Sequence, residues 1–536
     1  MATHHIPYAE TGYFSSIICD YLDKKSDLRP FYTDFPTIEA FGKQLEAKKN
    51  FSPEQREVLV KTLKKQYKGL KTSGKTTRNI NLLANDHAFT VTTGHQLNLF
   101  TGPLYFLYKI IHTIKLSQKL KEEYANYDFI PIYWMATEDH DFEEINYFNL
   151  KGKKVRWNRE DIADNDKGAV GRLANKGLKA LHDQLCAELG TTEMARTLCD
   201  LFEESYLKHD NLAAATRYLA NALFAEYGLV ILDADEADLK RQFIPVMKQE
   251  LTEKISYNTV HKSAEKLEEL GYDIQVTPRE INLFYLKENL RERIIERDGD
   301  YFVHDTQLQF TREELLDELD KHPERFSPNV IMRPAYQEMI LPNLCYIGGG
   351  GELAYWLELK SYFDKIALPF PLLMLRNSAL LMSEKQLGKA KKMNISVADL
   401  FLDNNDLVNR RIRKISNIDI DFTPQKRHLV RQFEEMYAIA EETDQSFLGA
   451  VKAQEVKQLK GLEHLEKRLL KAQKRKLSDE VNRLNKLQLQ LFPQENLQER
   501  ITNFSEFYLQ YGKTLIPDLM EALNPENPKF TVLVLD

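Results

Sequence analysis

The sequence predicts an α/β fold built around a parallel β-sheet, and two features carry this prediction. Apolar runs typical of strands buried on both faces alternate with segments in which apolar residues recur at helical spacing. Polar and ionisable residues follow directly after these runs, which cover residues 89–93, 129–135, 228–232 and 370–375. Parallel strands end at the same edge of a sheet, so these polar residues should line one crevice there.

The run at 89–93 leads into a polar turn at 93–102 and then into a helix. The apolar residues at helical spacing in that helix are Leu104, Leu107, Tyr108, Ile111 and Ile114. Thr101 or Gly102 can cap the helix, and Pro103 suits its first turn. An ordinary turn is the alternative, because TGHQ matches neither of the established phosphate-loop patterns. The candidates here for binding a nucleotide or substrate are Thr93, Gly94, His95, Gln96, Asn98, Thr101 and Gly102.

Four ionisable residues follow the run at 129–135, and they are Glu138, Asp139, His140 and Asp141. We interpret them as catalytic, because a histidine titrates near neutral pH and can accept a proton, while carboxylates can recognise an amine or hold Mg²⁺. A solvated loop or helix start is the alternative. Asp233 and Asp235 follow the run at 228–232 in the same way, and we place them in the same crevice. Helix capping by Asp235 explains its position equally well.

Four consecutive glycines lie between an apolar, strand-like segment and an amphipathic helix. Glycines allow backbone conformations closed to other residues, and their N–H groups can form an anion-binding nest beside a helix N-terminus. A tight packing turn or flexible loop is the alternative. Upstream, Arg333 can bind a carboxylate or phosphate, or form half of a structural ion pair. The binding candidates from this part of the chain are Arg333, Tyr336, Gln337, Gly348, Gly349, Gly350, Gly351, Glu352, Arg376 and Asn377.

The composition shifts after residue 380, and Lys, Arg, Glu, Gln and Leu come to dominate. Leucines at heptad spacing predict a long helix that Pro493 ends, and these leucines are Leu470, Leu477, Leu484 and Leu491. A helix at about 424–442 can fold back on the long helix and form an antiparallel coiled coil. Such a hairpin is a candidate homodimer interface. The final run at 530–535 is predicted to be a strand that returns to the core.

The order of the predicted helices and strands divides the chain into four parts. Residues 1–84 form an N-terminal, mostly helical extension, and residues 85–380 form a discontinuous core. We interpret about 151–226 and 250–326 as insertions between the strands of that core, the second of them with strands at 274–276 and 282–286. Residues 381–515 form the helical coiled-coil domain, and residues 516–536 return to the core.

Composition excludes several classes of protein. The 536-residue chain is too long for one compact domain, and its 43% hydrophobic content is ample for a core. A net charge of −7 argues against a general nucleic-acid-binding surface. The cysteines, Cys19, Cys186, Cys199 and Cys345, show neither metal-ligand spacing nor a dense disulfide pattern, so free thiols are expected. Neither a signal peptide nor a membrane-spanning run is indicated, and a cytoplasmic location is expected.

Five long segments, taken together, resemble the successive motif blocks of the bacillithiol biosynthesis cysteine-adding enzyme family. They occur in the family's order between about residues 92 and 378, and they read TTGHQLNLFTGPLY, IPIYWMATEDHDFEEIN, GYDIQVTPREINLFYL, SPNVIMRPAYQEMILPNLCYIGGGGELAYW and PFPLLMLRNS. The length and the coiled-coil region also match. His95 is a departure, since Gln is expected at this position in many relatives, and a proton-shuttling role for His95 is therefore not expected.

The resemblance implies a Rossmann-like core with two connective insertions and a coiled-coil domain, similar to class I aminoacyl-tRNA synthetases and nucleotidyl transferases. It implies a reaction in which the carboxyl group of cysteine is joined to the amine of glucosaminyl-malate. A carboxylate oxygen is a poor leaving group, so the carboxyl must be activated, and ATP with Mg²⁺ is the suspected source of an acyl phosphate or acyl adenylate. Two alternatives are a non-catalytic nucleotide-sensing or scaffolding protein and, by fold analogy alone, an RNA-linked aminoacyl transferase.

Overall fold

A five-stranded parallel sheet forms the centre of the computed structural model, which describes residues 2–159, 168–443 and 445–535. The strand order is β13-β12-β2-β3-β6. The strands are β2 (Ala88–His95), β3 (Asp128–Met135), β6 (Val230–Asp233), β12 (Asn343–Gly348) and β13 (Leu372–Leu375). All neighbouring pairs are parallel, so the predicted Rossmann-like sheet is confirmed.

The order of the strands reverses between β2 and β12. From β2 the chain moves outward through β3 to β6, and it then crosses to the other side of β2 to add β12 and β13. In open α/β sheets such a reversal leaves a crevice outside the carboxyl ends of the two central strands. Because β2 ends at His95 and β12 ends at Gly348, this crevice lies beside the glycine run.

Helix α5 (Tyr105–Glu123) packs against β2 and β3, and its predicted apolar face is fully buried. The predicted cap was wrong. The helix has Leu104 as its N-cap residue, because Phe100, Thr101 and Gly102 adopt positive φ and form a separate turn. Pro103 forms an isolated β-bridge with Asn503 and precedes the helix.

Between β3 and β6 the chain forms a small hairpin and a helical group. The hairpin joins β4 (Tyr147–Leu150) to β5 (Lys153–Arg156). The main helices are α7 (Leu178–Leu189), α8 (Glu193–Phe202) and α9 (Leu212–Phe224). Cys186 on α7 and Cys199 on α8 form a disulfide with a Cα–Cα distance of 5.7 Å, so the expectation of free thiols was wrong for this pair. A short connection brings the two helices together, which cysteine spacing alone did not indicate.

Between β6 and β12 the chain forms α11 (Ile244–Glu253), α12 (Ile255–Glu269) and a second, antiparallel sheet in the order β10-β9-β8-β7-β11. Its strands are β7 (Leu283–Lys287), β8 (Leu290–Arg297), β9 (Asp300–Val303), β10 (Gln309–Phe310) and β11 (Phe326–Pro328). The strand predicted at 282–286 corresponds to β7. The strand predicted at 274–276 was wrong, since these residues are not in a strand.

The two ends of the chain meet in a third sheet in the order β1-β15-β14. Its strands are β1 (Ala2–Pro7), β14 (Ala379–Ser383) and β15 (Lys529–Leu535), so the predicted return of the C-terminal run to the body is confirmed. The N-terminal helices are α1 (Ser16–Leu22), α2 (Ile38–Lys48), α3 (Pro53–Gln66) and α4 (Gly74–Leu82), and β1 precedes them.

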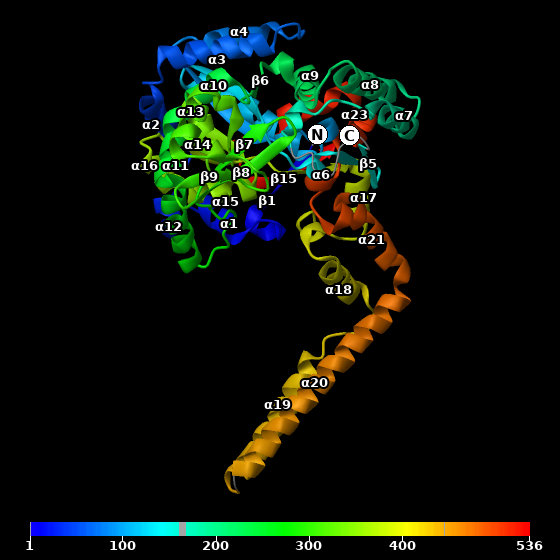
Figure 1. Ribbon diagram of the computed structural model, residues 1–536. Coiled ribbons are helices and arrows are strands. Elements are labelled where there is room, and N and C mark those ends of the chain that lie inside the picture. The colour runs from blue at the N-terminus through cyan, green and yellow to red at the C-terminus, as the bar shows by residue number, and fades with distance from the viewer. Residues whose placement is uncertain (1, 160–167, 444, 536) are drawn as a thin grey trace.

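A long helical arm projects from the body (Figure 1). It pairs α19 (Thr423–Glu441) with α20 (Gln445–Lys476), and Phe433, Ala440 and Val451 are buried between them. The predicted hairpin is therefore confirmed, but the heptad leucines do not form its seam. Leu484 and Leu491 lie on α21 (Ser478–Leu491) and pack into the core of the body.

Candidate active site

Two adjoining cavities of about 790 Å³ each open at the carboxyl edge of the parallel sheet. The one we call the glycine cavity lies at the ends of β2 and β12 and is bordered by Gly94 and residues 349–351. The one we call the histidine cavity lies between the end of β3 and the antiparallel sheet and is bordered by His140 and His304. The residues that border both cavities are Trp134, Ala136, Val330 and Arg333. Ligands in the two cavities would therefore lie next to each other.

A buried ion pair borders the glycine cavity. Lys109 Nζ on α5 lies 2.5 Å from Glu352 Oε2 and donates to the carbonyl oxygen of Gly94 at 2.7 Å. Glu352 also accepts hydrogen bonds from the Tyr346 hydroxyl at 2.7 Å and from the Gly349 N–H at 2.8 Å. Burial raises the pKa of Glu352, but Lys109 and these donors lower it more, so the pKa lies below its usual value. Glu352 is therefore a carboxylate in the free protein.

The glycine run does not have the backbone that was predicted for it. Gly348 ends β12, Gly350 begins α15 (Gly350–Glu358), and no glycine of the run has a positive φ. A Cβ on Gly348 would lie 2.5 Å from Leu353 Cδ1, so this glycine permits close packing of strand and helix. The Gly349 N–H is already bonded to the Glu352 carboxylate, and a bound anion would have to displace it.

Arg376 follows β13 and borders the glycine cavity. Its Nη2 donates to Glu499 Oε1 at 2.7 Å, and its guanidinium lies 5.0 Å from the centre of the Tyr105 ring. Burial lowers the pKa of Arg376, but the Glu499 carboxylate raises it more. Asn377 lines neither cavity, because its backbone N–H donates to His112 and its side chain donates to the carbonyl oxygen of Asn524.

Arg333 stands in the wall that the two cavities share. It begins α14 (Arg333–Ile340), and its Nη1 donates to Gln337 Oε1 while its Nη2 donates to the Tyr355 hydroxyl, both at 3.1 Å. Its hydrogen bonds thus go to neutral groups rather than to the structural ion-pair partner that we considered. Tyr336 and Gln337 are fully buried and border neither cavity, and the Tyr336 hydroxyl donates to the carbonyl oxygen of Ala234. Gln337 therefore serves to orient Arg333.

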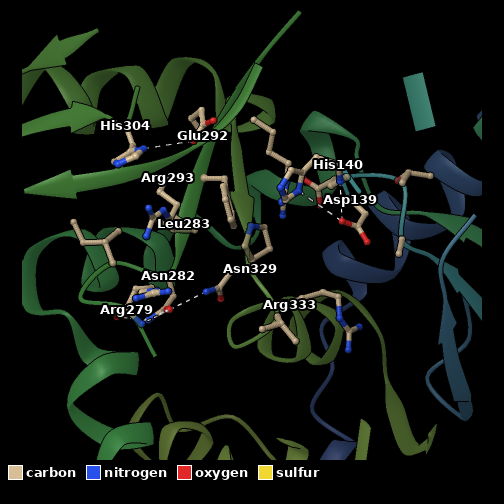
Figure 2. A pocket seen from close by; sticks show the side chains of 18 of the residues that line it. Asp139, His140, Arg279, Asn282, Leu283, Glu292, Arg293, His304, Asn329 and Arg333 are labelled. Carbon is tan, nitrogen blue, oxygen red and sulfur yellow. Dashed lines mark hydrogen bonds and ion pairs between the residues drawn. The ribbon is translucent and has the colours of Figure 1, made fainter. Parts of the chain in front are cut away.

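His140 and Asp139 lie across the histidine cavity from Glu292 and Arg293 on β8 and from His304, which directly follows β9 (Figure 2). Arg291 on β8 donates from Nη1 to His140 Nδ1 at 2.8 Å. Since an arginine can only donate, a neutral His140 must carry its proton on Nε2. Burial lowers the pKa of His140, and the charge of Arg291 lowers it further.

Asp139 links the two cavities. Its Oδ2 accepts from Gln96 Nε2 at 2.9 Å, and its Oδ1 accepts the His140 backbone N–H at 2.7 Å. Gln96 comes from the loop after β2 and borders the glycine cavity. The carboxylate of Asp139 is thus held in place from both sides.

The other predicted acidic residues are engaged elsewhere. Glu138 borders the histidine cavity, but its Oε1 lies 2.5 Å from Lys240 Nζ, and burial raises its pKa against the opposing effect of Lys240. Lys240 also lies 2.8 Å from Asp235, whose second partner is Arg172 at 2.7 Å. Capping by Asp235 was wrong, because Glu236 is the N-cap residue of α10 (Ala237–Arg241).

Two further candidates lie outside both cavities. Asp233 accepts the Thr137 hydroxyl at 2.5 Å and fixes the end of β3 against β6. Asp141 is the N-cap residue of the short helix α6 (Phe142–Ile145), and its side chain accepts the Glu144 N–H at 3.3 Å. Both side chains therefore serve structural roles.

Some of the predicted residues in the turn after β2 border a cavity, and the others do not. Gly94, His95 and Gln96 border the glycine cavity, and burial, with Lys109 as the next cause, lowers the pKa of His95 to about 3. The four turn residues that border neither cavity are Thr93, Asn98, Thr101 and Gly102. The Thr93 hydroxyl donates to the carbonyl oxygen of Ile347 at 2.8 Å and so links β2 to β12.

Within the described residues, one group has the spacing of metal ligands: Glu292, His304 and Asp305, whose ligand atoms all lie within 4.8 Å of one another. An imidazole with two carboxylates suits a divalent transition metal better than Mg²⁺, which prefers oxygen ligands alone. The Mg²⁺ site that we considered at Glu138 is less favourable, since Lys240 already neutralises that carboxylate.

Sequence reasoning missed several ionisable residues that border the cavities, among them Lys109, Arg291 and Arg293. Lys109 lies in the buried helix that follows the turn. A lysine among apolar residues is unusual there, and this feature of the sequence could have pointed to it. Arg291 and Arg293 alternate along LRERIIER, and this period of two places both on the face of β8 that borders the histidine cavity. That strand was not recognised, so neither arginine was considered.

Comparison with known proteins places the chain in a family. Residues 1–377 match the family model described as the N-terminal Rossmann-like domain of bacillithiol biosynthesis BshC, and residues 379–535 match the C-terminal coiled-coil domain of the same protein. The chain belongs to the bacillithiol biosynthesis BshC family. The expected Rossmann-like and coiled-coil parts are thereby confirmed.

Relatives in this family match along nearly their whole length. A protein of Flavobacterium johnsoniae named "Putative cysteine ligase BshC" is 58% identical over 536 residues, with 100% of both chains covered. One of the same name from Christiangramia forsetii is 58% identical, with 99% of both chains covered. One from Bacillus thuringiensis is 27% identical, with 97% of this chain and 98% of the relative covered.

None of the helices in the described ranges combines the length and the hydropathy that crossing a membrane requires.

Proposed function

We propose that this chain is a ligase that joins the carboxyl group of L-cysteine to the amine of glucosaminyl-malate, the last step of bacillithiol biosynthesis. Family membership and the name shared by relatives of 58% identity support cysteine ligation. The observation in the structure that carries the proposal is the pair of cavities that meet at Arg333 and Trp134. Joining two substrates requires two adjacent binding sites with the reacting groups at their common border.

We assign the anionic substrate groups to the arginines. Arg333 and Arg376 border the glycine cavity, and Arg279, Arg291 and Arg293 border the histidine cavity. Arginine binds carboxylates and phosphates with paired hydrogen bonds. ATP with a divalent cation, bound beside these residues, would supply the phosphoryl or adenylyl group that turns the cysteine carboxylate oxygen into a leaving group.

The amine must lose a proton before it attacks, and we assign this step to Asp139 and His140. Asp139 recognises the amine through its fixed carboxylate, and His140 accepts the proton. The hydrogen bond from Arg291 occupies the only acceptor nitrogen of His140, so the imidazole becomes a base when Arg291 turns to an anionic ligand. Binding of the anion would thus precede proton transfer.

Thiol profiling by mass spectrometry in the source organism tests the proposed function. Deleting the gene should abolish bacillithiol and raise glucosaminyl-malate, and the wild-type gene should restore both. Unchanged bacillithiol, with no second copy of the gene present, would refute the ligase and favour the nucleotide-sensing or scaffolding alternative. In that case ATP should still raise the melting temperature of the purified protein.

Variants of the purified protein test the site. Asp139→Asn and His140→Ala should lower product formation by at least about 100-fold, the lower end of the range of about 10²–10⁴ for a group that transfers a proton. Asp141→Asn is the matched control, because asparagine keeps the helix cap and the side chain borders neither cavity. Equal activity in all three variants would remove Asp139 and His140 from the mechanism.

We also propose that the arm forms a homodimer. Its helices expose Met436, Ile439, Phe447, Val456 and Leu465, each between 43% and 61% exposed. Apolar side chains gathered on one projecting element mark an interaction surface. Sedimentation should show a dimer for the wild type and a monomer for Ile439→Glu. Leu270→Glu, at an exposed leucine on the body, is the control, and a monomeric wild type would refute the proposal.

A further inference from the structure

The disulfide between Cys186 and Cys199 lies away from both cavities, in the helical group between β3 and β6. Both cysteines are half-buried. Their surroundings differ, because Cys199 packs against the apolar core of the body whereas Cys186 Sγ contacts the His182 ring on α7. The two sulfur atoms are therefore not equivalent toward a reagent from solution.

A histidine stands beside the more polar of the two sulfur atoms. His182 Nε2 lies 3.5 Å from Cys186 Sγ, and His182 Nδ1 lies 3.1 Å from Asp183 Oδ1. A histidine held by a carboxylate promotes formation of the thiolate, which is the reactive form of cysteine. A purely structural disulfide has no need of this arrangement.

The disulfide is also linked to the loop that follows β2. The His182 ring lies 6.1 Å from the Phe202 ring, which lies 5.4 Å from the Phe100 ring and 4.7 Å from the Tyr206 ring. The backbone N–H of Phe100 donates to the Tyr206 hydroxyl at 2.8 Å. Tyr206 lies in the turn of π-helix (Glu203–Leu207) that directly continues α8, the helix of Cys199.

The loop at the end of this chain of contacts is strained. Phe100 and Thr101 adopt φ angles of 49° and 70°, which residues other than glycine rarely adopt. Such conformations persist only where surrounding contacts hold them. The contacts from Phe202 and Tyr206 are part of what holds this loop, which begins at Gln96 in the wall of the glycine cavity.

We propose that Cys186 and Cys199 form a reversible thiol–disulfide couple that exchanges with low-molecular-weight thiols and their disulfides, and that its state controls how firmly Phe202 and Tyr206 hold the strained loop. In oxidation, the Cys186 thiol gives its proton to His182, and the thiolate attacks a disulfide RSSR, forms a mixed disulfide and releases RS⁻, which takes up that proton as the first RSH. The Cys199 thiol then attacks the mixed disulfide, gives up its proton and releases a second RSH. In sum, two protein thiols and RSSR give the protein disulfide and two RSH.

The exchange chemistry is tested with 2-hydroxyethyl disulfide as the probe. After reduction, Cys199→Ser should accumulate one mixed disulfide at Cys186, located by peptide mass spectrometry. His182→Gln in that background should slow the modification by about threefold for each unit by which the thiol pKa rises, since the loss of thiolate is partly offset by its greater nucleophilicity. His261→Gln, an exposed histidine on α12, is the matched control. No adduct at Cys186, or equal rates in both histidine variants, would overturn the exchange site.

The link to the loop is tested by hydrogen exchange in the otherwise unmodified chain. Reduction by 2-mercaptoethanol should speed exchange of the Phe100 and Thr101 amides, and reoxidation should restore their protection. Tyr206→Phe removes the hydroxyl that accepts the Phe100 N–H, so it should give the fast rate in both redox states. Equal exchange in the oxidised and reduced wild type would overturn the coupling, and this result does not depend on the ligase activity.

Discussion

Replacing Glu499 with glutamine would leave the buried charge of Arg376 without its ionic partner. Arg376 Nη2 lies 2.7 Å from Glu499 Oε1, and the two side chains are only 4% and 0% exposed. Two unit charges about 4 Å apart interact by about 4 kcal/mol at an effective dielectric constant of about 20. Glu499 also accepts the Ala379 N–H at 2.9 Å through its other oxygen, and glutamine has one oxygen for these two donors. We therefore expect Glu499→Gln to lower the free energy of unfolding by about 3–5 kcal/mol, as for other broken buried pairs.

Urea unfolding followed by tryptophan fluorescence measures this loss. Glu495→Gln is the matched control, because Glu495 is an exposed residue in the same segment and undergoes the same change of charge. A second variant with both Arg376→Met and Glu499→Gln should recover part of the lost stability, since neither charge is then left unpaired. A difference below about 1 kcal/mol between Glu499→Gln and Glu495→Gln would refute the reasoning, because this is the range of solvent-exposed pairs.

Three further predictions follow from single residues. Burial raises the pKa of Glu358 from 4.5 to about 7. The folded protein therefore holds this proton more tightly than the unfolded chain, and the stability that this contributes is present below about pH 4.5 and is lost as the pH rises through 7. The free energy of unfolding of Glu358→Gln, measured in urea, should rise by about 3 kcal/mol relative to that of the wild type as the pH goes from 4 to 8. A difference between the two proteins that does not change with pH would contradict this. His95→Gln should leave product formation largely intact, because the His95 pKa of about 3 keeps the imidazole neutral, and a large loss in the ligation assay would refute this. Gly102→Ala should lower the free energy of unfolding by more than about 1 kcal/mol, since φ is 63° and the new Cβ would lie 2.6 Å from Asn98 Cβ, whereas Gly461→Ala in the open face of α20 should raise it.

The strands of the parallel sheet were predictable because their signal is local. The run at 129–135 became β3 (Asp128–Met135), since a strand covered on both faces must be apolar along its whole length. The antiparallel sheet was harder to predict, because its strands are not apolar along their whole length. Strand β8 carries Arg291 and Arg293 on the face that borders a cavity, with Glu292 between them, so its sequence resembles a solvated segment.

The structural reason for the glycine run is a packing contact that cannot be recognised in the sequence. The prediction relied on the conformational freedom of glycine, whereas Gly348 is needed because Leu353 Cδ1 occupies the space of a side chain. The heptad pattern failed in a similar way. Leu484 and Leu491 have coiled-coil spacing, but the helix that carries them packs on the body rather than on α19. Periodicity gives the apolar face of a helix, and only the tertiary fold decides what covers it.

The pairing of the ionisable residues in the free protein constrains how the site can work. Glu352 is paired with Lys109, Glu138 with Lys240, and His140 accepts from Arg291. A ligand that binds these groups must replace an existing partner rather than fill an empty position. Arg291 and His140 are separated by 151 residues, so the insertion that carries β8 holds the imidazole that we propose as the proton acceptor. An anion that draws Arg291 away would therefore create the base only when the substrates are in place, which would protect an activated carboxyl group from premature reaction with water.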